Sequence, residues 1–380
     1  MSAPHLPFNR PFATGRELEY IRQAIEGAHL SGDGPFTRRC QEWLEARVGS
    51  ARALLTHSCT AALEMIAFLA GLEPGDEIIM PSFTFVSTAN AFVLRGGVPV
   101  FVDVRPDTLN VDEKKIEGAI TARTRAIVVV HYAGVACEMN TITAVARHRN
   151  LWLFEDAAQA LMATYDDRPL GSFGHLAAVS FHETKNVIAG EGGALLVNTA
   201  ELAPRAEILR EKGTNRSQFF RRKVDKYTWV DLGSSYLPSE INAAFLAAQL
   251  EEADTITERR RAIWGGYHER LAPLERRGVL RRPTVPSGCR HNAHLYYVLA
   301  EDRAARTRML ETLARHGVNA VFHYVPLHSS PAGRRHGRPH GDLTLTEELS
   351  ERLVRLPLWV GMTDAHLEQV VKAVRESIGA

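Results

Sequence analysis

Residues 177–197, which read AAVSFHETKNVIAGEGGALLV, place a lysine between two short apolar runs. The runs, at 177–181 and 194–197, are continuous, as is typical of strands that are buried on both faces. Lys185 follows the first run, and a glycine cluster allows a tight turn before the second. A lone ammonium group at the end of a core strand is costly, and burial lowers its pKa from about 10.4. A neutral amine is a nucleophile, so this stretch predicts a reactive lysine at the edge of a sheet.

Similar apolar runs alternate with helical patterns over residues 52–197, and this rhythm predicts a mostly parallel sheet with helices on both faces. The other predicted strands lie at 52–55, 77–80, 98–103, 126–130 and 151–155. Within this region one helix is expected to begin at Thr60 and another to end at Leu94. The predicted fold class is therefore α/β.

The chain has 380 residues, more than the roughly 250–300 at which a single core usually divides, so we expect two domains. A long helical pattern at 241–271 indicates a connector, and a smaller α+β domain should follow it. The expected elements of that smaller domain lie at 293–300, 309–315, 319–325 and 363–378. We predict a large domain over residues 1–250, with the N-terminal segment included, and a small C-terminal domain over residues 251–380.

A helix is also predicted near the N-terminus. Thr14 and Glu17 have the spacing of a capping box, and the helix should end near Gly27. The apolar residues at helical spacing behind this box are Leu18, Ile21 and Ile25.

The composition is that of an ordinary globular protein, with 45% hydrophobic residues, 23% charged residues and a formal net charge of +1. Nothing in it suggests a nucleic-acid partner. The N-terminus lacks a basic start followed by an apolar run, and no stretch approaches the roughly 18 apolar residues of a membrane span. We therefore expect no membrane partner and a cytoplasmic location.

Cysteine and histidine usage does not favour a metal site. The widely spaced cysteines, which form no CxxC pair, are Cys40, Cys59, Cys137 and Cys289. The histidines that crowd one C-terminal region are His323, His328, His336 and His340. Because residues 331–342 read PAGRRHGRPHGD, we expect a loop there, which could not aim these rings at a metal.

In an open α/β sheet, ligands bind beyond the carboxyl ends of the strands. At one such place Ser58, Cys59 and Thr60 form a turn that opens an apolar helix. The free N–H groups and the positive end of the helix dipole suit a phosphate group there. Alternatively, Ser58 and Thr60 only cap the helix.

At a second place Glu155 and Asp156 end a predicted central strand. An unpaired buried carboxylate is strongly destabilising, so we expect a cationic partner. That partner is either an arginine in a structural ion pair or the protonated ring nitrogen of a cofactor. The residues themselves leave both readings open.

Lys185 provides the third place, because a lysine amine forms a Schiff base with a carbonyl group. Pyridoxal phosphate is the cofactor that most often uses this reaction. It needs a lysine for its aldehyde, a carboxylate for its ring nitrogen and a helix N-terminus for its phosphate, and the three places supply one each. The glycines at 189–193 precede a strand and form no G-x-G-x-x-G, so we do not expect a nicotinamide site.

Longer motifs extend this pattern over essentially the whole chain. They are SGDGPFTRRCQEWLE (31–45), SCTAALE (58–64), PSFTFVSTANAFVLRGGVPVFVDV (81–104), EDAAQA (155–160), SFHETKN (180–186), GEGG (190–193), HYVPLH (323–328) and LPLWVGMT (356–363). In these motifs the chain resembles the nucleotide-sugar aminotransferases, pyridoxal-phosphate enzymes with the aspartate aminotransferase-like type I fold. That fold has a large mixed-sheet domain and a smaller α+β C-terminal domain.

The resemblance implies that Lys185 holds the cofactor as a Schiff base and that Asp156 pairs with its ring nitrogen. The other implied cofactor contacts are ring stacking by Phe85, a contact of Gln159 with the phenolic oxygen, and phosphate contacts by Ser58, Cys59, Thr60 and Ser180. The implied substrate contacts come from Asn215, Arg216, His323 and Tyr324.

The chain departs from the family pattern at one place. Many relatives carry an asparagine in a G-x-N-x-R stretch, where it reaches the cofactor phosphate of the partner subunit. Residues 233–237 read GSSYL, so Ser235 takes that position. The resemblance implies a homodimer with sites at the two-fold interface.

The resemblance also implies a ping-pong reaction with L-glutamate as amino donor. Lys185, once freed, would move the proton between the substrate and the cofactor. Within the family, residues 131–142, 211–221 and 224–237 are most similar to transaminases that form dTDP-4-amino-4,6-dideoxygalactose from dTDP-4-keto-6-deoxyglucose.

Three alternatives remain at this stage. The enzyme could act on a different nucleotide keto-sugar, such as a 3-keto sugar. A sugar dehydratase of the same fold would carry a histidine in place of the lysine; here the lysine is present, with His182 close by. A sensor that keeps the fold without catalysis would predict broken site residues or an added DNA-binding segment, and the sequence shows neither.

Overall fold

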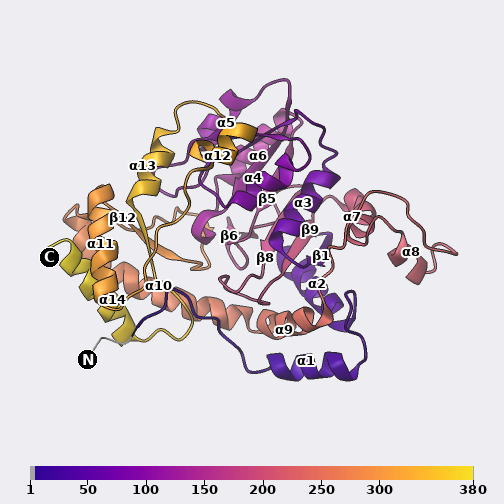
Figure 1. Cartoon of the computed structure of the whole chain (residues 1–380), viewed down its shortest axis with the longest axis horizontal. Coiled ribbons are helices and arrows are strands. Elements are labelled where there is room, and N and C mark those ends of the chain that lie inside the picture. The colour runs from indigo at the N-terminus through magenta and orange to yellow at the C-terminus, as the bar shows by residue number, and fades with distance from the viewer. Residues whose placement is uncertain (1–4, 380) are drawn as a thin grey trace.

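The computed structural model describes residues 5–379 (Figure 1). Residues 1–4 and 380, which the predicted domain limits include, lie outside the described residues. The centre of the molecule is an eight-stranded sheet. In spatial order its strands are β1 Arg52–Thr56, β9 Gly193–Val197, β8 Leu176–Ser180, β5 Trp152–Asp156, β4 Thr124–Val130, β2 Glu77–Pro81, β3 Val98–Val102 and β13 Arg338–Pro339. Only β9 runs antiparallel to its neighbours, so the prediction of a mostly parallel sheet is confirmed.

Helices cover both faces of this sheet, which explains the continuous apolar runs of the strands. Along β4, Ile127 and Val129 face one core while Val128 faces the other, because successive side chains of a strand point to opposite faces. The helices of the first face are α1 Glu17–Glu26, α2 Pro35–Val48, α5 Glu113–Ala119, α6 Met139–His148 and α9 Glu240–Glu251. Those of the second face are α3 Cys59–Leu69, α4 Val86–Val93 and α7 Ala203–Arg210.

The C-terminal part builds a separate core around a small antiparallel sheet. Its strands are β10 Leu280–Arg281, β12 Tyr296–Ala300 and β14 Leu353–Leu356. The helices of this part are α10 Ala253–Arg276, α11 Arg303–Arg315, α13 Thr344–Arg352 and α14 Asp364–Ser377. Fully buried Tyr267, Met309 and Val371 join α10, α11 and α14 in this core.

The connector predicted as one helical pattern is two helices. Glu252, with φ −100° and ψ 11°, leaves the helical region between α9 and α10. The adjoining Ala253 is fully buried, so the break lies inside the protein. The apolar residues keep their helical spacing across this break, so the sequence pattern did not reveal it.

Two segments cross the predicted division between the domains. The stretch expected to be a loop contains α12 Pro331–His336 and β13, which pairs in parallel with β3 at the edge of the large sheet. That part of the loop prediction was wrong. Gly337 lies so close to Phe101 and Pro99 that only a glycine fits there, and this close approach brings residues 338–339 into pairing distance of β3. At the other end of the chain, Leu6 bridges to Val318 and packs in the C-terminal core.

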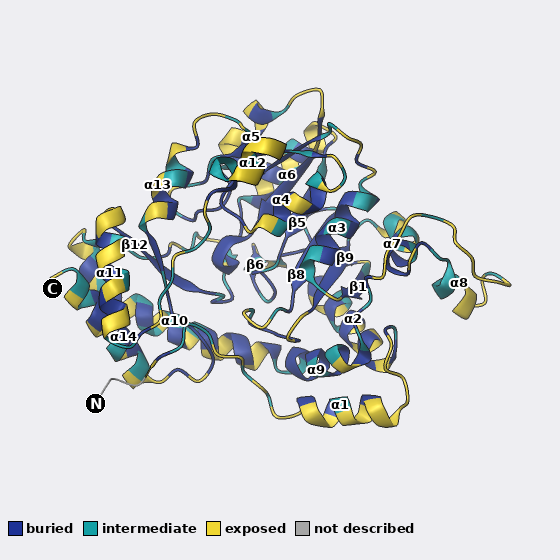
Figure 2. Cartoon of the chain, viewed as in Figure 1, coloured by how far each residue is buried: buried dark blue, intermediate teal, exposed yellow. Residues whose placement is uncertain are grey.

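Helix α1 differs from its prediction in two ways. Its N-cap is Arg16 without a side-chain cap, while the Glu17 carboxylate accepts the backbone N–H groups of Thr14 (2.6 Å) and Gly15 (2.9 Å). Much of this helix is exposed (Figure 2): of the expected apolar face, Leu18 is 81% exposed and Ile25 is exposed as well, whereas Ile21 is half-buried and packs against the core. The buried residues of α1 are Glu17, Tyr20 and Ala24.

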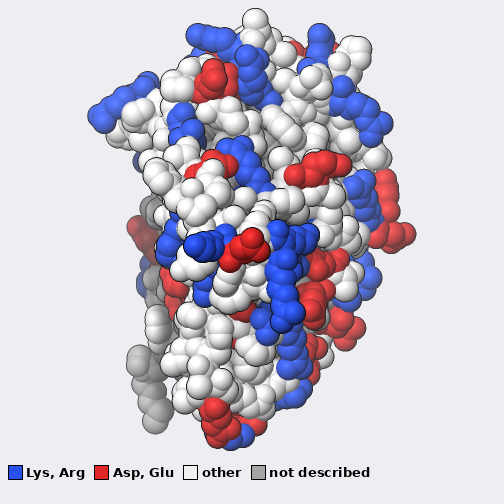
Figure 3. All heavy atoms as spheres, turned by 90° about the vertical axis from the view of Figure 1, so that its right-hand side faces the viewer, with Lys and Arg blue, Asp and Glu red and all other residues white. Residues whose placement is uncertain are grey.

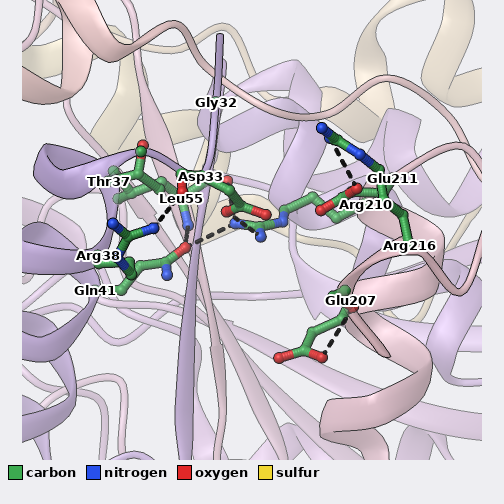
Figure 4. Close-up of polar contacts among 12 residues, drawn as sticks. Gly32, Asp33, Thr37, Arg38, Gln41, Leu55, Glu207, Arg210, Glu211 and Arg216 are labelled. Carbon is green, nitrogen blue, oxygen red and sulfur yellow. Dashed lines mark hydrogen bonds and ion pairs between the residues drawn. The ribbon is translucent and has the colours of Figure 1, made fainter. Parts of the chain in front are cut away.

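Residues 211–235 form an arm that carries α8 Arg216–Phe220 away from the body of the molecule (Figure 1). A β-bridge between Glu211 and Ser235 closes its base. Figure 3 shows that lysine and arginine side chains gather on this side of the molecule, with acidic side chains between them. Arg210, 2% exposed, anchors the base by pairing with Asp33 and donating to Gln41 (Figure 4).

Among the helices of residues 5–379, none combines the length and the apolar composition that crossing a membrane requires.

Candidate functional site

A cavity of about 850 Å³ opens at the carboxyl ends of β5 and β8, where residues of the C-terminal part face the large sheet. It brings together side chains that lie far apart in the sequence. The predicted site residues that line it are Ser58, Cys59, Thr60, Phe85, Asp156, Gln159, Ser180, Lys185, His323 and Tyr324.

Lys185 lies in the turn after β8, where its backbone N–H donates to the His182 carbonyl at 2.8 Å. No side chain or carbonyl in the described part of the chain forms a hydrogen bond or ion pair with its ammonium group. Burial lowers the pKa of Lys185, and the nearby Arg355 guanidinium lowers it further, against the opposing effects of Cys59 and Asp156. The amine is therefore available to a ligand, and a larger fraction of it is neutral than in water.

Asp156 ends β5 and is 5% exposed. Its carboxylate accepts the Thr88 hydroxyl at 2.6 Å and the Ala158 N–H at 3.1 Å. No arginine or lysine in residues 5–379 forms an ion pair with it. Among the described residues, Asp156 therefore has no structural ion pair with an arginine, which was one of its two expected partners.

Glu155 has a different environment, because it precedes Asp156 in the strand and points to the opposite face. It accepts His131 Nε2 at 2.9 Å, and both residues are fully buried. Three backbone N–H groups, those of Gly171, Phe173 and Gly174, donate to the same carboxylate at 2.6–2.7 Å. Glu155 therefore organises the loop before β8 and does not belong to the cavity.

In the turn before α3, Ser58 caps the helix as expected, whereas the Thr60 hydroxyl lies 2.8 Å from the Ser87 hydroxyl and does not cap it. The Ser58 hydroxyl accepts the Ala61 N–H at 3.1 Å and caps the helix. The N–H groups of Cys59 and Thr60 have no acceptor in the described residues, so they remain free for a ligand. A Cβ at Gly193 would lie 2.4 Å from the Cys59 nitrogen, so only a glycine lets β9 support the turn this closely.

Gln159 and Tyr324 are joined across the cavity. Gln159 Nε2 donates to the Tyr324 hydroxyl at 2.9 Å, and its Oε1 accepts the Ala133 N–H at 2.7 Å. The rings of Tyr324 and His323 stack at 3.6 Å, and His323 Nδ1 lies 2.7 Å from the Tyr132 hydroxyl. Burial holds the pKa of His323 well below its usual range, so the ring is neutral near pH 7.

Phe85 is the N-cap residue of α4 and is 56% exposed. Its ring centroid lies 6.3 Å from that of Tyr324. The side chain thus lines the cavity from a largely open position, where stacking on a ligand ring would bury it.

Three predicted site residues do not line the cavity of their own chain. Asn215 accepts the Thr228 N–H at 2.8 Å, and Arg216 lies 3.4 Å from Glu211; both belong to the arm. Ser235 is exposed at the base of the arm. A contact of these residues with a cofactor or substrate would require a second subunit, so it stays a prediction.

The sequence reading missed two cationic residues of the cavity, Arg260 and Arg355. Arg355 directly precedes the LPLWVGMT motif, which is a signal that could have drawn attention to it. Arg260 is the middle one of three consecutive arginines in helix α10, and no neighbouring motif distinguishes it from the other two. Within the described chain, no three histidine, cysteine or acidic side chains are grouped to hold a metal.

The chain is similar to known proteins over nearly its whole length. Residues 12–375 match the family model of the DegT/DnrJ/EryC1/StrS aminotransferases. The chain is 33% identical to the spore coat polysaccharide biosynthesis protein SpsC of Bacillus subtilis, over 98% of this chain and 97% of that protein.

Two solved structures are similar throughout. The aminotransferase TlmJ of Streptoalloteichus hindustanus has a TM-score of 0.90 and 30% identity, covering 98% of this chain and 99% of that one. DesV of S. venezuelae has a TM-score of 0.89 and 30% identity, covering 99% of both chains.

Proposed function

Because the chain belongs to the DegT/DnrJ/EryC1/StrS aminotransferase family, we propose that it transfers an amino group from L-glutamate to C4 of a nucleotide-linked 4-keto-6-deoxy sugar. The chain is a pyridoxal-phosphate-dependent aminotransferase with the type I fold. Its family acts on sugars in nucleotide-sugar or polysaccharide biosynthesis. The observation that carries the proposal is the convergence of Lys185, Asp156 and the α3 N-terminus on one cavity.

The residues of this cavity fit pyridoxal phosphate. Lys185 has an amine without a protein partner, and Asp156 has a carboxylate whose hydrogen bonds come from neutral donors only. The free N–H groups of Cys59 and Thr60, with the nearby Ser180 hydroxyl, suit a phosphate. We therefore assign the aldehyde to Lys185, the ring nitrogen to Asp156 and the phosphate to this turn.

When bound, pyridoxal phosphate supplies an aldehyde and an electron-withdrawing ring. Asp156 accepts a charge-assisted hydrogen bond and stabilises a protonated ring nitrogen. The Lys185 amine, with its lowered pKa, accepts a proton at Nζ and returns it, as general acid–base catalysis requires. Tyr324, fixed by Gln159, and the neutral His323 present hydrogen-bonding groups that suit sugar hydroxyls.

The reaction that we propose is balanced, because an amino group and a hydrogen on the donor carbon are exchanged for the keto oxygen of the sugar carbon. L-glutamate becomes 2-oxoglutarate, and the keto carbon of the sugar becomes a CH–NH₂ centre. We propose dTDP-4-keto-6-deoxyglucose as the acceptor and dTDP-4-amino-4,6-dideoxygalactose as the product. The similarity of residues 131–142, 211–221 and 224–237 to transaminases that form this product supports the choice.

We further propose that the enzyme is a cytoplasmic homodimer. The exposed apolar side chains of α1 and the arm would be covered in such an assembly. They are Leu18, Ile25, Phe219, Phe220, Tyr227, Trp229, Val230 and Leu232. All four cysteines are free thiols, which suits a reducing compartment.

The test is an assay of the purified enzyme with pyridoxal phosphate, L-glutamate and a panel of nucleotide keto-sugars. We expect an amino sugar from the 4-keto-6-deoxy substrate, identified by mass and by NMR coupling constants that fix the position and orientation of the amine. Conversion of a 3-keto sugar alone would contradict the proposed substrate. A deoxygenated product without nitrogen would indicate a dehydratase instead.

A further inference from the structure

The ring of His294 lines the cavity and is attached to the turn that carries Lys185. His294 lies shortly before β12 and is half-buried. Its Nδ1 lies 3.1 Å from Oδ1 of Asn186, the residue that directly follows Lys185 in the chain. The C-terminal part of the protein therefore contributes a second titratable ring to the cavity, in addition to that of His323.

The hydrogen bonds of Asn186 fix which ring nitrogen of His294 carries the proton. Asn186 Nδ2 donates to the Asn292 carbonyl at 2.8 Å, and a carbonyl only accepts, so Oδ1 of the same amide faces His294. Since Oδ1 also only accepts, the ring donates through Nδ1. Burial, aided by the charges of Lys185 and Arg260, holds the pKa of His294 well below its usual range, so the ring is neutral near pH 7. Nε2 then has no proton and is a hydrogen-bond acceptor.

The backbone around this ring is held from several sides. The His294 N–H donates to Asn292 Oδ1 at 3.0 Å, and the His294 carbonyl accepts Arg260 Nη2 at 2.6 Å. Asn292, 1% exposed, donates in turn to the Gln159 carbonyl at 2.8 Å. Ala293 has a φ of 53°, in the left-handed region, which a residue with a side chain keeps only where its surroundings enforce it. The position of the ring is thus fixed before any ligand binds.

Nε2 of His294 is an acceptor in a cavity that offers many donors. It has no hydrogen-bond partner within residues 5–379. The charged side chains that line the cavity are the donors Lys185, Arg260 and Arg355 and the acceptors Asp156 and Glu191. Asp156 is assigned to the ring nitrogen of the cofactor, and Glu191 lies 3.7 Å from His182. A ligand hydroxyl group in this cavity therefore meets few free acceptors, and Nε2 is one of them.

The chemistry of the reactants decides which of them this acceptor suits. The carboxylates of L-glutamate and 2-oxoglutarate and the diphosphate of a nucleotide sugar only accept hydrogen bonds near pH 7, so they do not pair with Nε2. The sugar carries hydroxyl groups, which donate. In a 4-keto-6-deoxy sugar, the neighbours of the keto carbon are C5, which carries a methyl group and the ring oxygen, and C3, which carries a hydroxyl group. The C3 hydroxyl is thus the O–H group nearest to the carbon that reacts at Lys185.

We propose that His294 binds the sugar by accepting a hydrogen bond at Nε2 from the C3 hydroxyl, and that Asn186 is a positioning residue that keeps the ring protonated at Nδ1. This inference rests on the proposed function in one respect, that the amino acceptor is a 4-keto-6-deoxy sugar. It makes His294 a residue that recognises the carbon next to the keto group. The amino-acid half of the reaction does not use this contact.

The test combines changes in His294 with a change in the substrate, in the holoenzyme. Each half of the reaction is followed by the change of cofactor absorbance, and the sugars are the 4-keto-6-deoxy nucleotide sugar and its 3-deoxy analogue. His294→Asn keeps an N–H group at the place of Nδ1 and has none at the place of Nε2, whereas His294→Gln offers an amide oxygen near the place of Nε2. His268→Asn is the matched control, because His268 lies on α10 of the same C-terminal part and does not line the cavity.

We expect His294→Asn to slow the sugar half of the reaction by about 10-fold at low sugar concentration, because one hydrogen bond is lost. The 3-deoxy analogue should react with wild type more slowly by a similar factor, and it should not distinguish wild type from His294→Asn. His294→Gln should retain more activity toward the complete sugar than His294→Asn. The amino-acid half should change by less than about threefold in every variant, and so should both halves in His268→Asn.

Asn186→Ala tests the positioning role. Without the amide oxygen, Nδ1 loses its acceptor and the proton is free to move to Nε2. We expect the ¹⁵N NMR signals of His294, identified by their absence in His294→Asn, to change from those of a ring protonated at Nδ1 to those of a mixture. The sugar half of the reaction should slow by about 3- to 10-fold, and the preference for the C3 hydroxyl should weaken with it.

Equal rates with the complete sugar and the 3-deoxy analogue in wild type would overturn this inference and leave the proposed function intact. An unchanged sugar half in a folded His294→Asn enzyme would do the same. Equal losses in both halves would also overturn it, since His294 would then act on Lys185 or the cofactor. An unchanged tautomer in Asn186→Ala would refute the positioning role. If wild type aminates no 4-keto sugar, the proposed function and this inference both fail.

Discussion

Lys185 and Asp156 line the same cavity but have opposite hydrogen-bonding environments. The Asp156 carboxylate accepts hydrogen bonds from two neutral donors, while the Lys185 amine has no partner among the described residues and a lowered pKa. The carboxylate is therefore held in place by its hydrogen bonds, and the amine is free to react and to move a proton. For Asp156 the cause is the hydrogen bonds from Thr88 and Ala158; for Lys185 it is burial.

Asp156→Asn removes the charge while leaving the shape of the side chain unchanged. We expect the variant to fold and to bind the cofactor. Its turnover should fall by roughly 10- to 100-fold, because a charge-assisted hydrogen bond contributes about 1.5–3 kcal/mol. Steady-state assays with saturating pyridoxal phosphate measure this. Asp112→Asn, at the N-cap of α5, is the control and should remain fully active. Wild-type turnover by Asp156→Asn would disprove the assigned pairing.

At the scale of single residues, the sequence predicted the groups that directly follow strands. Lys185, Asp156 and the turn at Ser58 were found because a polar residue after an apolar run is unusual. The partner of Glu155 was out of reach, because His131 lies 24 residues earlier and only the fold brings it close. Arg355 was missed for a similar reason, since its place in the cavity depends on how β14 faces the large sheet.

Among the elements, burial on both faces made the seven longer strands of the large sheet readable from sequence. The short edge strand β13 was not, since two residues among glycines, prolines and arginines carry no periodic signal. The apolar spacing of α1 was real, but Leu18 and Ile25 are exposed in the single chain. Apolar spacing shows which face of a helix is apolar, but it does not show which part of the protein, or which partner, packs against that face.

The base of the arm carries a titration that affects stability. Burial, followed by hydrogen bonding to Asp33, raises the pKa of Glu211 to about 7 (Figure 4). The folded protein thus holds a proton that the unfolded chain releases near the usual glutamate pKa. The stabilising effect of that proton is complete below this value and is lost as pH rises toward 7.

Glu211→Gln should remove this pH dependence. Between about pH 4.5 and 7 the free energy of unfolding of wild type should fall by roughly 2–3 kcal/mol more than that of the variant, at about 1.4 kcal/mol per pKa unit. Urea unfolding at several pH values measures the difference. Glu201→Gln, at an exposed position, should retain the wild-type slope. Parallel curves for wild type and Glu211→Gln would contradict the assignment.

For the whole molecule, the question is how the arm relates to the cavity. Asn215, Arg216 and Ser235 lie on the arm and not in the cavity of their own chain. The sequence could predict that they matter only through resemblance, because no local pattern places a residue in a neighbouring subunit. The proposed dimer would bring the base of each arm to the site of the other chain.

Complementation tests this arrangement. Lys185→Ala and Ser235→Asp should each be inactive as pure proteins, the second because a carboxylate repels the cofactor phosphate. Refolding the two together should restore about a quarter of the wild-type activity, since half of the dimers are mixed and each contains one intact site. A mixture no more active than its components, or a fully active Ser235→Asp, would contradict a site shared between subunits.

The central claim is the covalent link at Lys185, and borohydride reduction of the holoenzyme tests it most directly. Reduction makes a cofactor–lysine bond permanent, and peptide mass spectrometry then locates it. We predict one labelled residue, Lys185, no label or turnover in Lys185→Ala, and normal labelling in Lys372→Ala, whose lysine is exposed on α14. A label on any other lysine, or turnover by Lys185→Ala, would contradict the account.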